Sequence, residues 1–283
     1  MTTLALSAEQ KQFFLKNGYL HLPKAIPDQL VNKWQSLLKD HNRDSFDLSD
    51  PFIARNISFL EMDNPRFIAR INNLMGHYPE EVLELLAHEA ILNIAESLCG
   101  NDAIPMQCDV LFKHAHSSSN VLWHQDAIYP RIAPYLNIGF YLDDANHEDG
   151  CLKLIPGSQS QRQNIKSISR NQEKFIIEIP ANAGDLIVHD LMIVHSSLPK
   201  KTAGVRRTLY MEWWSESAAI GHGSFSKKWI YLLKNWKALL TNRSAKQYQK
   251  NGSSSSMLPP ESQVIEQILE LREQPIPANY GFQ

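Results

Sequence analysis

The sequence predicts an α+β, mainly β protein: a double-stranded β-helix core (jelly roll, cupin-like) flanked by N- and C-terminal helices. Short runs of β-forming residues occupy the region 105–214, separated by turn clusters such as Asp143–Asn146 and Pro156–Ser158. Amphipathic patterns at helical spacing precede and follow this region. Many short strands with helices segregated to the flanks are typical of a jelly roll backed by helices.

The predicted strands share a content of β-branched and aromatic residues, and each is bounded by turn-forming residues. They are Met106–Lys113, Leu136–Leu142, Cys151–Ile155, Lys174–Ile179, Asp185–Val194 and Arg207–Trp214. We expect the 283 residues to form a single domain in three parts. These are a mainly helical part over 1–104, the jelly-roll core over 105–214 and a helical extension over 215–283.

The expected helices carry recognisable end signals. Ser7 and Gln10 have the spacing of a capping box, and Gly18 follows as a stop. A longer helical pattern runs from Pro79 towards Gly100, with a break expected near His88.

The C-terminal extension is expected to contain an amphipathic helix, a loop and a last helix over Ser262–Arg272. Trp229, Leu233, Trp236 and Leu240 recur near one helical face, which must be buried against the jelly roll or a second subunit. The serine-rich segment Asn251–Ser256 is expected to be a loop, and both an active-site lid and a simple connector fit it.

Composition is that of an ordinary soluble protein, 43% hydrophobic and 20% charged, with a net charge of -2. No basic stripe is present, so nucleic acid is not an expected partner. No run approaches the roughly 20 apolar residues of a membrane span. The N-terminus lacks the pattern of a signal peptide, which predicts a cytoplasmic protein. Cys99, Cys108 and Cys151 lack metal-type spacing and are expected to be small buried hydrophobes in a reducing compartment.

A candidate metal site is formed by His124, Asp126 and His195. Residues two apart in a strand point the same way, so His124 and Asp126 can reach one ion while Gln125 points elsewhere. His195 follows a long apolar run and would come from a distant strand. Two histidines and one carboxylate are the ligands that hold non-haem Fe(II) on one face.

Other histidines compete for this role. His189 and Asp190 offer a second possible ligand set, although a hydrogen-bonded histidine on a buried strand is the favoured interpretation. Four more histidines have no partner at ligand spacing: His77, His88, His147 and His222.

Two adjacent arginines, Arg206 and Arg207, follow His195. Only the one that faces inward can bind a group next to the candidate metal site. Arg206 shares its strand face with polar residues, whereas Arg207 shares a face with Leu209, Met211 and Trp213. Alternation therefore favours Arg206 as the inward-facing residue. Its guanidinium could bind a carboxylate through two parallel hydrogen bonds.

Taken in order, these motifs resemble the phytanoyl-CoA dioxygenase family, which is related to the ectoine hydroxylases. The resemblance covers about residues 7–214 and rests on a series of short segments. They are Trp123–Asp126, Leu142–Asp144, Asp149–Leu152, Ile155–Ser158, Gly184–Asp185, and His195 with Arg206. Two positions depart from the family pattern: Gln159 replaces a histidine, and Lys200 replaces an asparagine.

The resemblance implies Fe(II) held by His124, Asp126 and His195, with 2-oxoglutarate and O₂ as cosubstrates. It implies that Arg206 binds the C5 carboxylate of 2-oxoglutarate and that Ser197 contributes a hydroxyl donor. Gln107 falls where relatives place a polar residue near the cosubstrate. Lys113 has two interpretations, a solvated lysine or one that approaches the site.

The implied function is a dioxygenase that hydroxylates or otherwise oxidises an unactivated C–H bond of a small molecule and releases succinate and CO₂. Amino-acid or secondary metabolism is the setting that the resemblance suggests. Four aromatic residues are candidates to line the substrate pocket: Tyr129, Phe140, Trp213 and Trp214. Two alternatives remain, a non-catalytic cupin-like metal-binding protein or sensor, and an acyl-CoA 2-hydroxylase. The oligomeric state does not follow from the sequence.

Overall fold

The three-dimensional structure is a computed structural model. It describes residues 5–60, 67–115, 120–126, 134–165, 175–223, 225–247 and 260–270. The pocket candidate Tyr129 and the serine-rich segment Asn251–Ser256 lie outside these residues.

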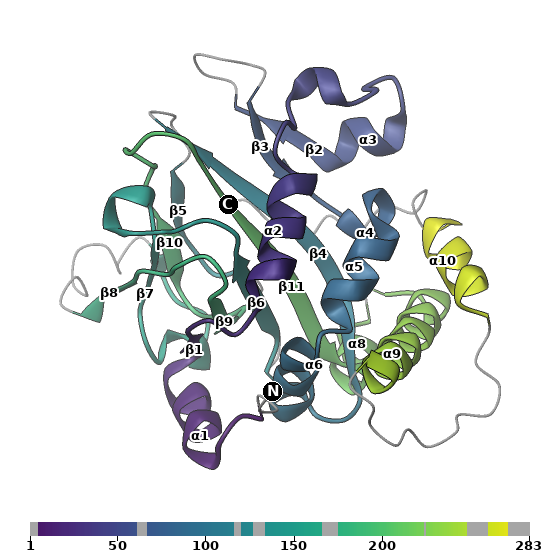
Figure 1. Ribbon diagram of the computed structural model, residues 1–283. Coiled ribbons are helices and arrows are strands. Elements are labelled where there is room, and N and C mark those ends of the chain that lie inside the picture. The colour runs from purple at the N-terminus through teal and green to yellow at the C-terminus, as the bar shows by residue number, and fades with distance from the viewer. Residues whose placement is uncertain are drawn as a thin grey trace.

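Two antiparallel sheets form the centre of the molecule (Figure 1). The larger has the strand order β1-β9-β6-β11-β4-β3-β2, and the smaller has the order β5-β10-β7-β8. The strands are β1 (Tyr19–Leu22), β2 (Ile57–Phe59), β3 (Ile68–Ile71), β4 (Ala103–His114), β5 (Val121–His124), β6 (Leu136–Tyr141), β7 (Leu152–Leu154), β8 (Ile177–Ile179), β9 (Leu186–Asp190), β10 (His195–Ser197) and β11 (Val205–Ser215).

The two sheets enclose a small apolar core of their own. Tyr141 and Ile187 from the larger sheet are buried together with Leu152, Leu154 and Ile179 from the smaller one. Sheet-on-sheet packing of this kind buries one face of each sheet. The predicted double-stranded β-helix core with flanking helices is therefore confirmed.

Helices cover the other face of the larger sheet. The helices are α1 (Ala8–Asn17), α2 (Asp28–Leu37), α3 (Pro51–Asn56), α4 (Leu74–His77), α5 (Pro79–Leu86), α6 (Glu89–Cys99), α8 (Glu216–His222), α9 (Lys227–Gln247) and α10 (Glu261–Glu270). In Figure 1, α2, α5 and α6 lie across the long strands β4 and β11. One large hydrophobic cluster joins these helices to the sheet.

The predicted helix ends agree with the structure. The Ser7 side chain accepts a hydrogen bond from the Gln10 amide, the Gln10 side chain bonds back to Ser7, and Gly18 ends α1 with a φ of 80°. The expected break near His88 is also present, because that residue separates α5 from α6 and its side chain caps the second helix. These short-range signals act within one turn of chain, so they can be read from sequence.

The run Asp185–Val194 is not one strand, contrary to the prediction. Strand β9 ends at Asp190, whose carboxylate accepts a hydrogen bond of 2.9 Å from the Met192 amide. The Ile193 amide bonds the Asp190 carbonyl at 2.9 Å, which completes a tight turn. The chain then enters β10 in the other sheet, so His195 begins a strand rather than ending one.

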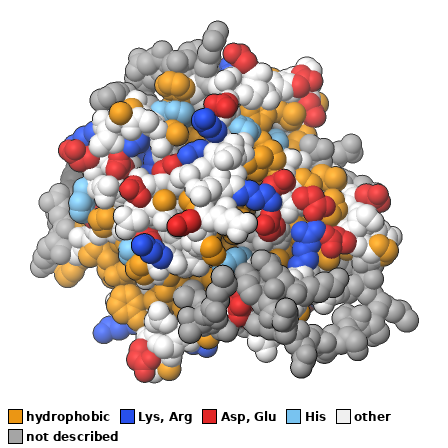
Figure 2. All heavy atoms as spheres, viewed as in Figure 1, with side chains coloured by type: hydrophobic (Ala, Val, Ile, Leu, Met, Phe, Trp, Pro, Cys, Tyr) orange, Lys and Arg blue, Asp and Glu red, His pale blue; other side chains and the backbone are white. Residues whose placement is uncertain are grey.

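The surface carries no large patch of a single charge on the face shown in Figure 2, where basic and acidic side chains are interspersed. This agrees with the net charge of -2. Among the residues that the structure describes, no helix combines the length and apolarity needed to cross a membrane.

The apolar stripe of α9 is buried against the larger sheet and its neighbouring helices. Trp236, Leu233 and Leu240 are each fully buried, while Tyr231 on the opposite side is 60% exposed. Trp236 belongs to the main hydrophobic cluster, and Leu233 packs in a second cluster beneath α8. The helix therefore fastens the C-terminal extension to the core.

We expect Trp236→Ala to lower the free energy of unfolding by about 3–5 kcal/mol, because it removes a large buried side chain and leaves a cavity. Tyr231→Ala on the same helix should change stability by no more than about 0.5 kcal/mol. Urea denaturation followed by circular dichroism measures both. Equal losses for the two variants would contradict the assigned orientation of α9.

Candidate active site

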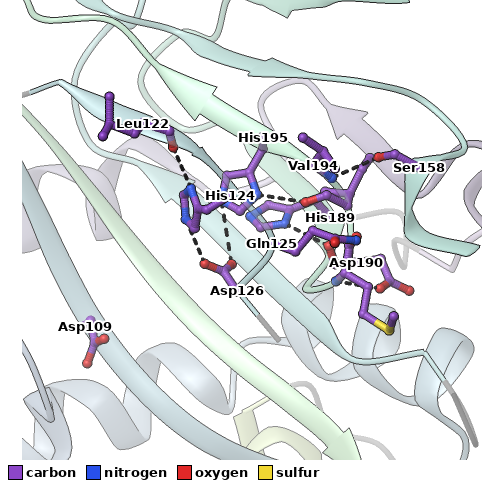
Figure 3. A network of polar contacts seen from close by, with 12 residues as sticks. Asp109, Leu122, His124, Gln125, Asp126, Ser158, His189, Asp190, Val194 and His195 are labelled. Carbon is purple, nitrogen blue, oxygen red and sulfur yellow. Dashed lines mark hydrogen bonds and ion pairs between the residues drawn. The ribbon is translucent and has the colours of Figure 1, made fainter. Parts of the chain in front are cut away.

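The candidate site lies where β5 pairs with β10. His124, the last residue of β5, is directly opposite His195, the first residue of β10, in the antiparallel register. The two imidazole rings have centroids 4.2 Å apart. Residues far apart in the sequence are thus brought together by a single strand pairing (Figure 3).

Asp126 lies beyond the end of β5, in the bend that follows, and not within a strand as predicted. The bend nevertheless returns its carboxylate to the two histidines. Its Oδ1 atom is 3.1 Å from Nε2 of His124, and its Oδ2 atom is 3.6 Å from Nε2 of His195. The three residues lie together as the sequence predicts, but a bend after β5, and not strand alternation, brings Asp126 to the histidines.

The other nitrogen of each histidine bonds a backbone carbonyl. Nδ1 of His124 is 2.7 Å from the Leu122 carbonyl oxygen, and Nδ1 of His195 is 3.0 Å from that of Ile193. A carbonyl can only accept, so each Nδ1 carries the proton and each Nε2 presents a lone pair. Outer contacts of this type fix the tautomer of metal-binding histidines.

The resulting donor set fits a divalent cation. The three ligand atoms of His124, Asp126 and His195 lie within 4.8 Å of one another. Among the described residues, no hydrogen-bond donor reaches the buried Oδ2 atom of Asp126. A cation bound between them would accept the lone pairs of both Nε2 atoms and the negative charge of the carboxylate.

The charge states of His195 and Asp126 are those that a metal requires. Burial lowers the pKa of His195 to about 3, which keeps its imidazole neutral. Burial opposes ionisation of Asp126, but the adjacent His195 and His124 hold the pKa of that carboxyl far below its usual range. For His124, burial disfavours the cation, but the interactions with Asp126 and with the Leu122 carbonyl together outweigh it and raise the pKa.

Two polar side chains fix the segment that leads into His195. Nε2 of Gln125 donates to the Met192 carbonyl at 2.5 Å, and the Gln125 oxygen accepts from the Gln163 amide at 2.8 Å. The Ser158 hydroxyl donates to the Ile155 carbonyl and accepts from the Val194 amide at 2.8 Å. The Pro156–Ser158 turn therefore holds the residue immediately before the histidine (Figure 3).

His189 is a neighbour of this group rather than a member of it. Its ring centroid lies 4.7 Å from that of His195, and its Nδ1 atom is 3.3 Å from the Asp190 carbonyl oxygen. It is almost fully buried, and burial lowers its pKa. It packs beside the candidate ligands, which agrees with the interpretation of a hydrogen-bonded histidine on a buried strand.

Arg206 and Arg207 face opposite sides of β11, as alternation predicted. Arg206 is 1% exposed and donates to the Gly150 carbonyl at 2.5 Å. Its Nε atom has no hydrogen-bond partner among the described residues. Arg207 instead forms hydrogen bonds of 2.8 Å to both carboxylate oxygens of Asp143 and one of 2.9 Å to the Gln35 carbonyl of α2. Only Arg206 retains a buried donor for another group.

Lys113, for which the sequence left two interpretations, is buried beside Arg206. The two residues are register partners in β4 and β11, and Lys113 donates to the Leu198 carbonyl at 2.7 Å. Burial and the neighbouring Arg206 lower the pKa of Lys113 to about 7. A second basic group therefore lies at this end of the site, and strand pairing rather than any sequence motif reveals it.

Ser197 and Gln107 are placed differently from one another. Ser197 lies on β10 two residues after His195, and its carbonyl is 3.5 Å from Nζ of Lys113. Gln107 donates to Asp109 at 2.5 Å, and that carboxylate also accepts from Arg70 at 2.6 Å. Six residues of strand separate Gln107 from Lys113, about 20 Å at the rise of a β-strand. Gln107 is therefore far from Arg206.

Two of the aromatic residues predicted to line the pocket do not do so. Phe140 and Trp213 belong to the hydrophobic cluster between the larger sheet and the helices. Their strand positions put them on the same face as Leu209 and Met211, so alternation turns them away from the candidate ligands. Trp214 faces a second cluster near α8, where its ring lies 4.7 Å from that of Tyr135.

The chain is similar in sequence to known oxygenases. The family model described as phytanoyl-CoA dioxygenase matches residues 14–208. The dioxygenase lolE1 of Epichloe uncinata is 24% identical over 214 residues, which is 72% of this chain and 81% of that protein. The L-proline trans-4-hydroxylase of Streptomyces griseoviridis is 28% identical over 165 residues, 56% of this chain and 58% of that protein.

The fold has close counterparts among solved structures. EctD from S. alaskensis superimposes with a TM-score of 0.63 at 21% identity, covering 77% of this chain and 80% of EctD. Because the family model spans most of the chain and includes all three candidate ligands, the predicted resemblance is confirmed. The chain is an enzyme of the phytanoyl-CoA dioxygenase family.

Proposed function

We propose that this chain is an Fe(II)- and 2-oxoglutarate-dependent dioxygenase that oxidises a C–H bond of a small molecule, with hydroxylation as the default outcome. One observation carries the proposal: the imidazoles of His124 and His195 and the carboxylate of Asp126 converge on one point. Relatives support it, since one is named a proline hydroxylase and EctD has been solved with Fe and with 2-oxoglutarate.

His124, Asp126 and His195 would hold the iron on one face. The iron, when bound, supplies the activation of O₂ coupled to decarboxylation of 2-oxoglutarate. The protein itself orients both imidazoles. The Leu122 and Ile193 carbonyls accept hydrogen bonds from Nδ1 of His124 and His195, which leaves Nε2 of each ring available to the metal. Three protein ligands on one face leave the opposite positions open to cosubstrates.

Arg206 would bind the distal carboxylate of 2-oxoglutarate. Its Nε atom is buried without a partner among the described residues, and the Gly150 carbonyl fixes the guanidinium through Nη1. Lys113 adds a second positive group when protonated, and a dianion beside it favours that state. Ser197 remains a candidate donor at this end. We do not assign Gln107 to the cosubstrate, because six residues of β4 separate it from Lys113, the register partner of Arg206.

The small-molecule substrate would enter on the side of the ligands opposite Arg206. Arg70 lies near enough to Asp126 for their charges to interact, and it pairs with Asp109 at 2.6 Å. Gln107 completes this polar group through its hydrogen bond to Asp109. A binding region lined by charged and amide side chains favours a polar substrate over a purely aliphatic one.

Turnover can be tested with a panel of free amino acids and other small polar metabolites. We expect at least one to stimulate succinate formation from 2-oxoglutarate in the presence of Fe(II) and O₂ and to gain one oxygen atom by mass spectrometry. Asp126→Ala protein is the matched control and should give only background. A non-catalytic binding protein would bind Fe(II) and 2-oxoglutarate but produce no succinate with any compound. Activity only with coenzyme A thioesters would instead identify an acyl-CoA hydroxylase.

Removal of His195 should abolish tight iron binding. Loss of a residue that hydrogen-bonds a metal ligand typically lowers metal affinity by roughly 10–100-fold, so loss of a ligand itself should lower it by more than about 100-fold. We therefore expect His195→Ala to lose Fe(II) under anaerobic titration, whereas His189→Asn should retain it within about tenfold. If the effects were reversed, His189 and not His195 would be the ligand.

Replacement of Arg206 by lysine should raise the apparent KM for 2-oxoglutarate by about tenfold or more, because a hydrogen bond to a charged group contributes roughly 1.5–3 kcal/mol. Lysine keeps the charge but cannot form the parallel pair of bonds. Arg207→Lys is the matched control: it should lower thermal stability through the loss of contacts to Asp143 and leave the KM near that of the parent. A larger KM effect at Arg207 would contradict the assignment.

A further inference from the structure

A second group of metal-binding side chains lies at the edge of the smaller sheet, outside the site described above. It consists of His147, Cys151 and Glu178, whose ligand atoms all lie within 4.8 Å of one another. His147 begins the short 3-10 helix His147–Asp149, Cys151 directly precedes β7, and Glu178 lies in the middle of the edge strand β8. No sequence pattern groups these residues, since His147 has no partner at ligand spacing.

Backbone geometry places the three side chains together. Lys153 of β7 is the register partner of Glu178, and Cys151 lies two residues before Lys153 on the same side of the chain. His147 reaches Cys151 through a turn at Gly150, which has a φ of 69°. A Cβ atom at Gly150 would lie 2.0 Å from the Leu198 carbonyl oxygen, so only glycine fits there.

The contacts within the group resemble one face of a tetrahedral zinc site. Sγ of Cys151 lies 4.0 Å from Nδ1 of His147, and the same nitrogen contacts Oε2 of Glu178. Ideal zinc bonds of about 2.3 Å to sulfur and 2.0 Å to nitrogen place these two atoms about 3.5 Å apart. To bind one cation, Sγ and Nδ1 would approach each other slightly, and the cation would displace the proton between His147 and Glu178. Lys153 pairs at 2.9 Å with the other oxygen of Glu178, Oε1, and leaves Oε2 directed at the histidine.

We propose that His147, Cys151 and Glu178 bind a thiophilic divalent cation such as Zn²⁺, with a water molecule in the fourth position. Sulfur, imidazole and carboxylate together suit zinc, whereas Mg²⁺ and Ca²⁺ prefer oxygen ligands alone. His147 is largely exposed, which gives the cation access and leaves room for the water. The thiol of Cys151 is buried. Because a metal binds the thiolate, binding of the cation releases the proton of this thiol.

This site differs chemically from the His124 site, because only the second contains sulfur. Co²⁺ can occupy both, but a thiolate-to-cobalt charge-transfer band in the near ultraviolet reports on Cys151 alone. We expect anaerobic titration of the full chain with Co²⁺ to produce this band. The band should persist in His195→Ala protein, which lacks a ligand of the first site. Its appearance therefore tests the second site independently of the proposed function.

Four further variants make the test specific. Cys151→Ser should abolish the band, and Glu178→Gln should weaken Co²⁺ binding at this site by about tenfold or more. Lys153→Gln, which alters the neighbouring charge but keeps all three ligands, should retain the band. His147→Ala should also lose it, and this exposed position remains informative if Cys151→Ser does not fold. No band in the parent protein, or an undiminished band in Cys151→Ser, would overturn the proposal and leave His147 and Glu178 as a surface ion pair.

Discussion

The antiparallel pairing of β5 with β10 sets His124 opposite His195, and the convergence of both histidines with Asp126 depends on that register. The pairing is short, with a register shift between His195 and Ser197, so the strands alone hold it weakly. Gln125 and Ser158 supply the missing restraint by bonding the Met192 carbonyl and the Val194 amide on the approach to His195. Polar contacts around the ligands thus replace the rigidity that a longer ladder would give.

The same pairing makes metal binding and local stability interdependent. β5 is the edge strand of the smaller sheet, four residues long, and its Leu122 is 74% exposed. A cation bound by His124 and Asp126 on one side and His195 on the other would link this edge strand to β10. Binding to the folded state alone raises stability in proportion to the logarithm of metal concentration. The most weakly supported strand in the site is therefore the one that a metal would secure.

Sequence patterns were informative where the controlling interaction is local. The capping box of Ser7 and Gln10 and the alternation that separates Arg206 from Arg207 both act over a few residues, and the structure agrees with them. The pattern failed at Asp190, because a side chain that caps a turn interrupts an otherwise continuous apolar run. The prediction for Phe140 is wrong because the sequence does not show which face of the sheet an aromatic residue of a strand occupies. The position of Lys113 beside Arg206 and that of Glu178 beside Lys153 depend on strand register, which no local pattern specifies.

Arg206 and Lys113 explain why this end of the site should favour a dianion. Two basic side chains are buried as register partners, and burial together with Arg206 lowers the pKa of Lys113 to about 7. An unfolded lysine has a higher pKa and keeps its proton to higher pH, so the folded state binds fewer protons above about pH 7. The free energy of unfolding therefore increases as the pH rises from about 7 towards the unfolded pKa. Below about pH 7 the lysine is protonated in both states, and its full destabilising effect on the folded state remains. A bound carboxylate reverses the balance, since it stabilises the protonated lysine. The fold thus keeps a repulsion between two cations that the negative charge of a cosubstrate relieves.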